Sequence, residues 1–330
     1  MVKSKVWILK KMFEGNAKAS DFELEEEDVS DNLKDGEFLI EALHWSVDPY
    51  MRSVDTGLLV PRNCMPGEQL SKVIASKNSS HPVGNVVRAF VGWRSHTLIT
   101  NVQLQGIGQM PEMGDLPLSL ALGILGMTGM TAYFGLLEIC QPKESETVLV
   151  NGAAGATGYI VGQIAKIKGC KVVGCAGTDA KCKWLKELGF DEVFNYKKVD
   201  LSEALKAAAP DGFDCFFDNI GGEFTATALK HMKQYGRVAL CGHISTYSDQ
   251  EPPKGEYPFY NMLSKQLKIQ AFNVMQFMSR WAEGEKVMAE WIKEGKIKYR
   301  ESITKGFQNM PSAFIGLFDG ANTGKAIVSA

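Results

Sequence analysis

The sequence predicts an α/β protein in which a β-rich domain precedes a second domain built on a doubly wound parallel sheet. Short runs of strand formers dominate the first 120 or so residues, and strands alternate with helices after residue 146. A glycine-rich stretch, N-G-A-A-G-A-T-G at 151–158, lies at the first strand-to-helix corner of the alternating part. A chain of 330 residues is long enough for two domains with cores of their own.

The β-rich domain is predicted to span residues 1–121. Its strand signals are V-W-I-L-K-K, E-F-L-I-E-A-L-H-W-S-V, S-K-V-I-A-S-K and G-N-V-V-R-A-F, separated by clusters of Gly, Pro and Asn. Residues 118–139 then read as helical, and Pro142 closes that segment.

Strands and helices alternate through the second domain, predicted at residues 122–298. The strand T-V-L-V-N leads into a helix, and K-V-V-G-C-A, E-V-F-N-Y and F-D-C-F-F-D follow with helical segments between them. A helix is expected from Glu223 to Gln234, before the strands R-V-A-L-C-G and L-K-I-Q-A-F-N-V. Such alternation predicts right-handed βαβ units and a parallel sheet. The tail, 299–330, is predicted to return to the first domain.

The glycines at the corner point to a bound pyrophosphate. Gly152, Gly155 and Gly158 recur every three residues between a strand and a helix. A helix N-terminus offers unpaired N–H groups and a partial positive charge, and glycines let a phosphate approach the backbone. The alternative is a tight contact between helix and sheet at Gly158 and Gly162, and different glycines can serve each purpose.

The second strand of this unit, Lys171–Ala176, favours NADP(H) over NAD(H). NAD-binding units place an acidic residue at the end of that strand for the ribose hydroxyls, and none stands there. Asp179 is close but is expected to cap the next helix. Lys181 and Tyr196 supply a cation and a phenol suited to a 2′-phosphate, although Lys181 could also be an ordinary solvated lysine.

Composition excludes several other classes of function. The net charge of −2 gives no reason to expect a nucleic-acid partner, and no apolar run reaches the length of about 20 residues that a membrane span needs. The start of the chain lacks the features of a signal peptide, so we expect a cytoplasmic protein. The seven cysteines and five histidines show no metal-ligand spacing, and no metal site is expected.

Six stretches carry a resemblance that runs the full length of the chain. They are V-D-P-Y-M-R (47–52), M-T-G-M-T-A-Y-F-G-L-L-E-I-C (127–140), N-G-A-A-G-A-T-G (151–158), F-N-Y-K (194–197), F-D-N-I-G-G-E (217–223) and C-G-H-I-S-T-Y (241–247). The chain resembles the leukotriene hydroxydehydrogenase and prostaglandin reductase group, also called alkenal/one oxidoreductases, within the medium-chain dehydrogenases/reductases. The resemblance implies a GroES-like domain followed by a Rossmann domain.

The resemblance also argues against zinc. Zinc-dependent members of the superfamily carry a Cys after an early strand, a Gly-His-Glu soon after it, and a lobe with four cysteines. The matching places here read W-S-V-D (45–48) and G-E-Q (67–69), and the four-cysteine lobe is missing. We therefore expect activation of the substrate by hydrogen bonds and by the cofactor.

The chemistry that the resemblance implies is NADPH-dependent reduction of the C=C bond of α,β-unsaturated aldehydes and ketones, including 15-oxo-prostaglandin-type eicosanoids. Hydride would reach the β-carbon, and the developing enolate oxygen needs only one or two donors. The implied donors are the phenol of Tyr247 and the nicotinamide ribose 2′-hydroxyl. Tyr50 is implied as a wall of the substrate cleft. Either tyrosine could instead have a packing role only.

Other family positions carry over as cofactor-binding residues where the side chains match. The resemblance implies that Gly155, Ala156, Thr157 and Gly158 contact the pyrophosphate and that Lys181 and Tyr196 contact the 2′-phosphate. It implies that Asn219 and the loop Cys241, Gly242, His243, Ile244, Ser245, Thr246 and Tyr247 line the nicotinamide half. The remaining implied cofactor residues are Phe272, Asn273, Val274 and Asn322. Two of the implied cofactor residues depart from the expected pattern, because we expect Val or a similar residue at Thr157 and a smaller residue at His243.

Three other functions stay open at the level of the sequence. The chain could be a quinone oxidoreductase with the same layout, although 47–52 and 241–247 argue against it. It could oxidise a leukotriene-type allylic alcohol with NADP⁺, or it could bind NADPH without catalysis. A homodimer is also expected, because the last sheet strand, near Leu267–Val274, leaves an edge that family members commonly pair across a two-fold axis.

Overall fold

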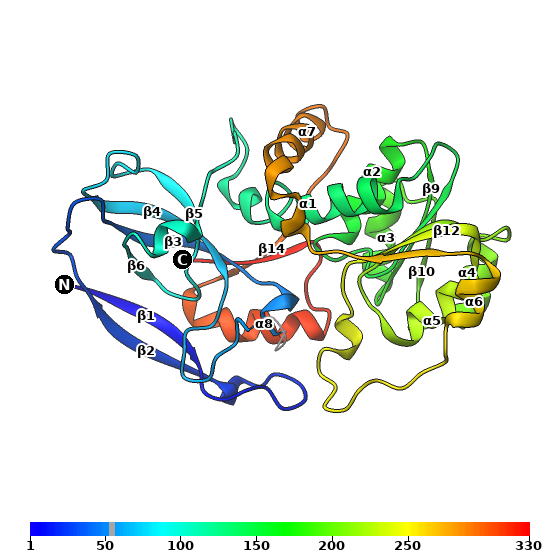
Figure 1. Cartoon of the computed structure of the whole chain (residues 1–330), viewed down its shortest axis with the longest axis horizontal. Coiled ribbons are helices and arrows are strands. Elements are labelled where there is room, and N and C mark those ends of the chain that lie inside the picture. Colours follow the sequence, from blue (N-terminus) through cyan, green and yellow to red (C-terminus); the bar gives the residue numbers. More distant parts are fainter. Residues whose placement is uncertain (53–56) are drawn as a thin grey trace. The chain divides into compact units, whose positions relative to one another are not determined.

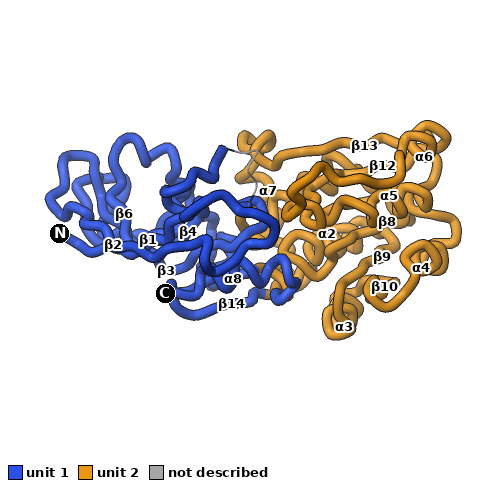
Figure 2. The backbone as a smooth tube through the Cα atoms, turned by 90° about the horizontal axis from the view of Figure 1, so that it is seen from below, with its two compact units in different colours: residues 1–123, 301–322, 326–330 blue, residues 124–300, 323–325 orange. Residues whose placement is uncertain are grey.

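The computed structural model describes residues 1–52 and 57–330, which fold into two compact units (Figures 1 and 2). Unit 1 comprises residues 1–123, 301–322 and 326–330, and unit 2 comprises residues 124–300 and 323–325. Within these described residues, no helix combines the length and apolar character needed to cross a membrane.

Unit 1 is β-rich. A two-stranded antiparallel ribbon pairs β1 with β2, and a larger sheet has the order β14-β15-β3-β4-β5-β7, with β6 pairing β3. The core of the unit packs Trp45, Trp93 and Phe314 with other apolar side chains. The strands are β1 (Val2–Leu9), β2 (Phe22–Val29), β3 (Phe38–Ser46), β4 (Glu68–Ser76), β5 (Val86–Phe90), β6 (His96–Ile99), β7 (Ile107–Gly108), β14 (Glu301–Lys305) and β15 (Lys325–Ser329), and the α-helix is α8 (Met310–Phe318).

Unit 2 contains a parallel sheet of six strands. Their order, β10-β9-β8-β11-β12-β13, corresponds to 3-2-1-4-5-6 in chain order, the arrangement of a doubly wound dinucleotide fold. The strands are β8 (Thr147–Val150), β9 (Lys171–Ala176), β10 (Glu192–Asn195), β11 (Phe213–Asp218), β12 (Met232–Leu240) and β13 (Lys268–Ala271). The predicted fold class, a β-rich domain followed by a Rossmann-type α/β domain, is confirmed.

Two groups of helices cover the sheet of unit 2. The helices α1, α2 and α7 pack on one another, and α4, α5 and α6 form a second group on the other side of the sheet (Figure 1). A π-helical turn, Gly135–Cys140, continues α1. The helices are α1 (Met127–Phe134), α2 (Gly158–Ile167), α3 (Asp179–Glu187), α4 (Leu201–Ala208), α5 (Gly222–Lys230), α6 (Phe259–Ser264) and α7 (Trp281–Lys293).

Two element boundaries differ from the sequence prediction. The helix expected over 223–234 ends at Lys230, and β12 begins at Met232. Met232 pairs with Phe213 of β11, and Tyr235 has a positive φ of 63°, which a helix does not allow. Pairing with the neighbouring strand therefore overrides the local helical pattern. The last strand is also shorter than expected, because β13 ends at Ala271.

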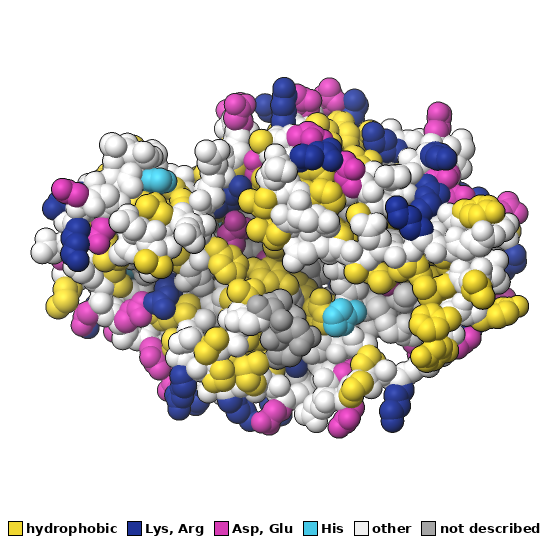
Figure 3. Space-filling view, in the orientation of Figure 1, with side chains coloured by type: hydrophobic (Ala, Val, Ile, Leu, Met, Phe, Trp, Pro, Cys, Tyr) yellow, Lys and Arg dark blue, Asp and Glu magenta, His cyan; other side chains and the backbone are white. Residues whose placement is uncertain are grey.

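Large apolar side chains are exposed around α6. Tyr260 and Leu263 on the helix are 79% and 81% exposed, and Tyr257 and Phe259 beside them are exposed too. Hydrophobic side chains accordingly lie at the surface in this region of unit 2 (Figure 3). Residues 265–267 separate α6 from strand β13, which, in the described part of the chain, lies at the end of the six-stranded sheet beside β12.

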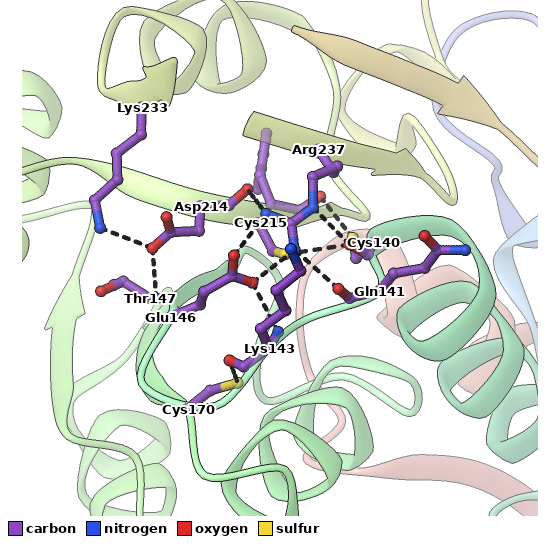
Figure 4. Close-up of polar contacts among 11 residues, drawn as sticks. Cys140, Gln141, Lys143, Glu146, Thr147, Cys170, Asp214, Cys215, Lys233 and Arg237 are labelled. Atoms are coloured by element: carbon purple, nitrogen blue, oxygen red, sulfur yellow. Dashed lines mark hydrogen bonds and ion pairs between the residues drawn. The ribbon is translucent and has the colours of Figure 1, made fainter. Parts of the chain in front are cut away.

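An arginine ties together the end of the sheet at which the parallel strands begin (Figure 4). Arg237 of β12 forms a bidentate ion pair with Glu146, with Nη2–Oε2 and Nη1–Oε1 distances of 2.6 and 3.0 Å. Its Nε donates to the carbonyl of Cys140 at 2.9 Å and its Nη2 to the carbonyl of Gln141 at 2.9 Å. These bonds satisfy carbonyls at the end of the π-helical turn.

Candidate functional site

The strand order of unit 2 changes direction between β8 and β11, and this switch point is where open α/β sheets bind ligands. Asn151 directly follows β8, and Asn219 directly follows β11. The 241–247 loop follows β12, and residues 272–274 follow β13. Because the strands are parallel, all of these predicted positions lie at the same edge of the sheet.

The glycines at the corner between β8 and α2 have two different roles: some allow close packing, and one leaves its backbone accessible. A methyl group on Gly158 would lie 2.5 Å from the carbonyl oxygen of Gly152, and one on Gly162 would overlap the ring of Phe190. These two glycines permit close helix–sheet packing. A methyl group on Gly155 would meet only that same carbonyl oxygen, at 3.2 Å.

Gly155 therefore presents an open backbone face at the N-terminus of α2. Ala156 and Thr157, which complete the turn before Gly158, are also partly exposed. A pyrophosphate fits this combination of open glycine backbone and helix N-terminus. Both interpretations of the glycine run thus apply, each to different residues.

A segment from near the chain's end fixes the outside of the glycine turn. The amide of Gly324 donates to the carbonyl of Ala154 at 2.8 Å, and Gly324 forms a parallel bridge with Gly155. Gly324 has a positive φ of 70°, and any side chain there would overlap Arg300. Asn322, a predicted cofactor residue, lies two positions earlier and is counted with unit 1.

A phenol and a lysine side chain lie beside Gly177, which directly follows β9. A methyl group on Gly177 would lie 3.2 Å from Oη of Tyr196 and 3.1 Å from Cε of Lys197. Burial lowers the pKa of Lys181, and the nearby charge of Lys197 lowers that pKa further. An anion bound between the two ammonium groups would relieve this repulsion, so the residues fit a 2′-phosphate.

Asp179 does not point to a ribose. Its carboxylate accepts from Nδ2 of Asn195 at 2.7 Å and pairs with Nζ of Lys198 at 2.5 Å, and these hydrogen bonds lower its pKa. The expected cap is corrected as well, because the side chain that caps α3 is Thr178, whose Oγ1 accepts from the amide of Lys181 at 3.3 Å.

A buried carboxylate joins the strand ends at the switch point. Asp218, the last residue of β11, is fully buried, and its Oδ1 accepts from Asn151 Nδ2 at 2.7 Å. The same oxygen accepts from the amides of Ile220 and Gly221 at 3.0 Å each, and Oδ2 accepts from the Thr225 hydroxyl. The carboxylate therefore fixes the end of β8 and the turn into α5 at once.

The amide side chains at the same point are equally constrained. Asn219 donates its backbone N–H to Oδ1 of Asn151 at 2.6 Å and its Nδ2 to the carbonyl of Asn151 at 2.9 Å. These two bonds and the Asn151–Asp218 bond form a closed set between β8 and β11. Asn219 is held in one orientation as a result.

The 241–247 loop docks on the same turn. The amides of Cys241 and Gly242 both donate to the carbonyl of Asp218, at 2.9 and 3.1 Å. Ser245 donates its amide and its hydroxyl to the carbonyl of Ile220, at 3.1 and 2.7 Å. A short 3₁₀ turn, Ile244–Thr246, then leads to Tyr247. The loop is thus held by the residues that close the switch point.

Tyr247 folds back over the start of its own loop. A methyl group on Gly242 would lie 3.4 Å from Oη of Tyr247. Burial raises the pKa of the phenol, and a hydrogen bond with the His243 backbone opposes that rise. Because this bond lowers the pKa, it stabilises the oxygen's negative charge, so the His243 N–H donates and Oη accepts.

The residues after β13 have well-defined packing roles. Phe272 lies 6.1 Å from Phe217 between ring centroids, and Gly135 leaves room for its ring. Oδ1 of Asn273 accepts from the amide of Met275 at 3.0 Å and so caps the 3₁₀ segment Val274–Arg280. Val274 is buried. Whether they also contact cofactor stays a prediction.

Tyr50 lies in unit 1, in the 3₁₀ turn Pro49–Arg52. The side chain is half-buried and packs against the unit's main core. Burial raises its pKa well above the ordinary value, and the charges of Asp48 and Glu68 add to that rise. Packing accounts for its position, and its contact with substrate stays a prediction.

Metal ligands do not gather anywhere in the described part of the chain. Among residues 1–52 and 57–330, no three His, Cys, Asp or Glu side chains lie together in a way that could hold a metal ion.

Four residues that the structure assigns to this edge were not predicted as site residues: Asn151, Lys197, Asp218 and Gly324. Asn151 and Asp218 could have been found from the sequence, because each is a polar residue that ends a buried apolar strand. Lys197 is adjacent to a predicted residue. Gly324 carries no local signal, because its partner at 155 is far away in sequence.

Comparison with known proteins agrees with this geometry. Residues 156–294 match the family model described as "Zinc-binding dehydrogenase", and residues 5–107 match the "N-terminal domain of oxidoreductase" model. The chain is 52% identical to prostaglandin reductase 1 of Rattus norvegicus over the whole of both chains.

A plant relative and a solved structure extend the comparison. The NADP(+)-dependent 2-alkenal reductase of Nicotiana tabacum is 38% identical over 99% of this chain and 97% of its own length. The crystal structure of CurA from Vibrio vulnificus in complex with NADPH is 35% identical, with a TM-score of 0.90 and coverage of 99% of each chain.

Proposed function

Because the chain belongs to the prostaglandin reductase group of the medium-chain dehydrogenases/reductases, and is an NADP-dependent oxidoreductase, we propose that it reduces the C=C bond of α,β-unsaturated aldehydes and ketones. The names of its relatives, prostaglandin reductase 1 and 2-alkenal reductase, are those of reductases. The substrate class includes 15-oxo-prostaglandin-type eicosanoids.

The residues of unit 2 would divide the cofactor among them. The open backbone of Gly155, Ala156 and Thr157 and the N-terminus of α2 would take the pyrophosphate. Lys181, Tyr196 and Lys197 would hold the 2′-phosphate. Asn219, the 241–247 loop and residues 272–274 would line the nicotinamide half. When bound, NADPH supplies the hydride.

The observation that carries the proposal is the position of the Tyr247 hydroxyl in the loop after β12. Its oxygen lies close to Gly242 at the edge where the parallel strands end, and a phenol can donate a hydrogen bond to an oxygen of the substrate. Reduction of an enone at the β-carbon places negative charge on an enolate oxygen, and a hydrogen-bond donor stabilises that charge. A saturated ketone would instead place the charge on a tetrahedral alkoxide, which calls for a stronger acid.

The test is the identity of the product. The protein is incubated with NADPH and a simple enone, a 2-alkenal, a 15-oxo-eicosanoid or a quinone, and the products are analysed by NMR and mass spectrometry. We expect consumption of NADPH with the first three and a saturated carbonyl compound as product. Turnover of the quinone alone would contradict the proposal.

We further propose that the protein is a homodimer joined at β13. The strand lies at the end of the six-stranded sheet beside β12, and the exposed side chains of Tyr260 and Leu263 on α6 shortly precede it in the chain. A free strand edge beside exposed apolar side chains favours pairing with a second copy of itself. A two-fold axis closes such an interface.

A further inference from the structure

The rings of His243 and Tyr247 are in direct contact within the 241–247 loop. Their centroids are 4.5 Å apart, and the ring planes are nearly perpendicular at 88°. Edge-to-face contact of this kind is a favourable arrangement for two aromatic side chains. The resemblance led us to expect a smaller residue at position 243, so this contact is not one that the resemblance implies.

The imidazole is itself held in place by Thr246. The Thr246 hydroxyl donates to the carbonyl oxygen of His243 at 3.1 Å. The same hydroxyl lies 2.8 Å from Nδ1 of His243, within hydrogen-bond distance. The ring is therefore held between Thr246 on one side and Tyr247 on the other.

The backbone of the same residue contacts the reactive end of the phenol. His243 N–H donates to Oη of Tyr247, and Oη lies over Gly242. One residue thus meets the phenol at two points, its oxygen through the amide and its ring through the imidazole. Rotation of the phenol away from the loop would break both contacts.

We propose that His243 is a positioning residue for Tyr247, and that its imidazole keeps the phenol in the orientation from which the hydroxyl donates to the substrate oxygen. The inference rests on the proposed function, because it assigns a purpose to the donor named there. The imidazole does not itself contact substrate in this proposal.

Two substitutions separate the ring from the rest of the residue. His243→Ala keeps the backbone amide but removes the ring, and we expect kcat with an enone to fall about 3- to 10-fold, the range for one lost aromatic contact. His243→Phe keeps a ring of similar size and should stay within about 2-fold of the wild type by the same reasoning. The KM for NADPH should change little in both variants. A loss in His243→Phe as large as in His243→Ala would overturn the proposal.

A double-mutant cycle gives a result that simple destabilisation would not. In a Tyr247→Phe background, the phenol no longer donates, so His243→Ala should have no further effect on kcat. Additive losses would show that His243 acts independently of the Tyr247 hydroxyl, and would overturn the proposal. If Tyr247→Phe alone leaves kcat unchanged, the donor role fails first, and that outcome is distinguishable from failure of the positioning role.

The contact between the His243 and Tyr247 rings can also be tested by NMR in the absence of cofactor. In cofactor-free protein carrying ¹³C-labelled tyrosine, the Tyr247 signal is assigned by its loss in Tyr247→Phe, and His243→Ala should shift it. His81→Ala is the matched control, because His81 stacks on Phe38 in unit 1 at the same centroid distance of 4.5 Å. This control should leave both the Tyr247 signal and kcat unchanged. An unmoved signal in His243→Ala would overturn the proposal.

Discussion

We propose that three side chains, Lys181, Tyr196 and Lys197, select NADPH over NADH. NADPH differs from NADH by a single phosphate, so only groups that reach this phosphate can discriminate between the two. Tyr196 and Lys197 lie beside Gly177, and the pKa of Lys181 is lowered by burial and, to a smaller extent, by the charge of Lys197. Charge-assisted bonds to a phosphate are stronger than neutral ones.

Substitution of Lys181 by Ala should therefore affect NADPH alone. We expect its KM to rise by roughly 10- to 150-fold, which corresponds to about 1.5–3 kcal/mol for a lost charged hydrogen bond. Use of NADH should hardly change. Initial rates with both cofactors measure this, and Lys198→Ala is the control because Lys198 is paired with Asp179. An equal loss with NADPH and NADH would contradict the assignment.

The Tyr247 hydroxyl has a similarly specific expected effect. Tyr247→Phe should lower kcat by about 10- to 1000-fold, the upper limit being the effect of a lost oxyanion donor. The KM for NADPH should stay close to the wild-type value, because the ring is retained. Steady-state kinetics with an enone measure both constants. A variant with normal kcat would mean that another group stabilises the enolate.

Single residues were predictable where their chemistry is local. Lys181 and Tyr196 follow strand ends and match a phosphate by type, so the sequence points to them. The internal partner of Asn219 could not be deduced in the same way, because the Asn151–Asp218 bond joins residues 67 apart in sequence. The contact between His243 and Tyr247 also depends on how the 241–247 loop folds back, and the loop conformation could not be predicted from the sequence.

At the scale of elements, hydrogen bonds of Asp218 connect the segments that follow three strands, β8, β11 and β12. The Asp218 side chain accepts from the residue after β8 and from the turn into α5, and its carbonyl holds the loop after β12. A carboxylate suits this position, because Asn151, Ile220, Gly221 and Thr225 all donate hydrogen bonds to it. The positions of the segments that follow β8, β11 and β12 therefore depend on the buried side chain and the carbonyl of Asp218, and Asp218 does not itself have to contact the cofactor.

Removal of that acceptor should destabilise unit 2 and loosen the cofactor edge. Asp218→Ala leaves buried donors unpaired, at a cost of about 3 kcal/mol, which lowers Tm by roughly 6–12 °C for a unit of this size. Asp218→Asn can keep its oxygen toward Asn151 and the two amides, so its loss should be clearly smaller. Calorimetry and NADPH titration measure both effects. Equal losses in the two variants would argue against the hydrogen-bond network as the cause.

Elements were predictable where local pattern and pairing agree. The alternation of strands and helices indicates the parallel sheet, since buried parallel strands have continuous apolar runs. The end of α5 was misplaced because 231–234 has a helical pattern locally, yet Met232 pairs with Phe213. The end of β13 was also misplaced: the predicted strand continues to Val274, but β13 ends at Ala271.

At the scale of the whole molecule, the first prediction concerns the oligomeric state. The proposed pairing of β13 predicts a dimer mass at micromolar concentration in light scattering. Leu263→Lys on the exposed face of α6 should weaken the dimer, because it places a charge in an apolar contact. His81→Ala, in unit 1, should leave the mass unchanged. A monomer in the wild type would rule out this interface.

Metal dependence is a second property of the whole chain. The matching family model carries the description of a zinc-binding dehydrogenase, but the sequence offers G-E-Q where zinc enzymes need a histidine. We expect full activity after dialysis against EDTA and no stoichiometric zinc by elemental analysis. One zinc retained per chain, with activity lost on its removal, would contradict this expectation.

The most direct test of the central claim follows the hydride itself. The protein is given an enone and NADPH that carries deuterium at both C4 positions of the nicotinamide, and the product is examined by NMR. The proposed chemistry predicts a saturated ketone with one deuterium at the former β-carbon and none at the carbonyl carbon. An allylic alcohol with deuterium at the carbinol carbon would contradict it.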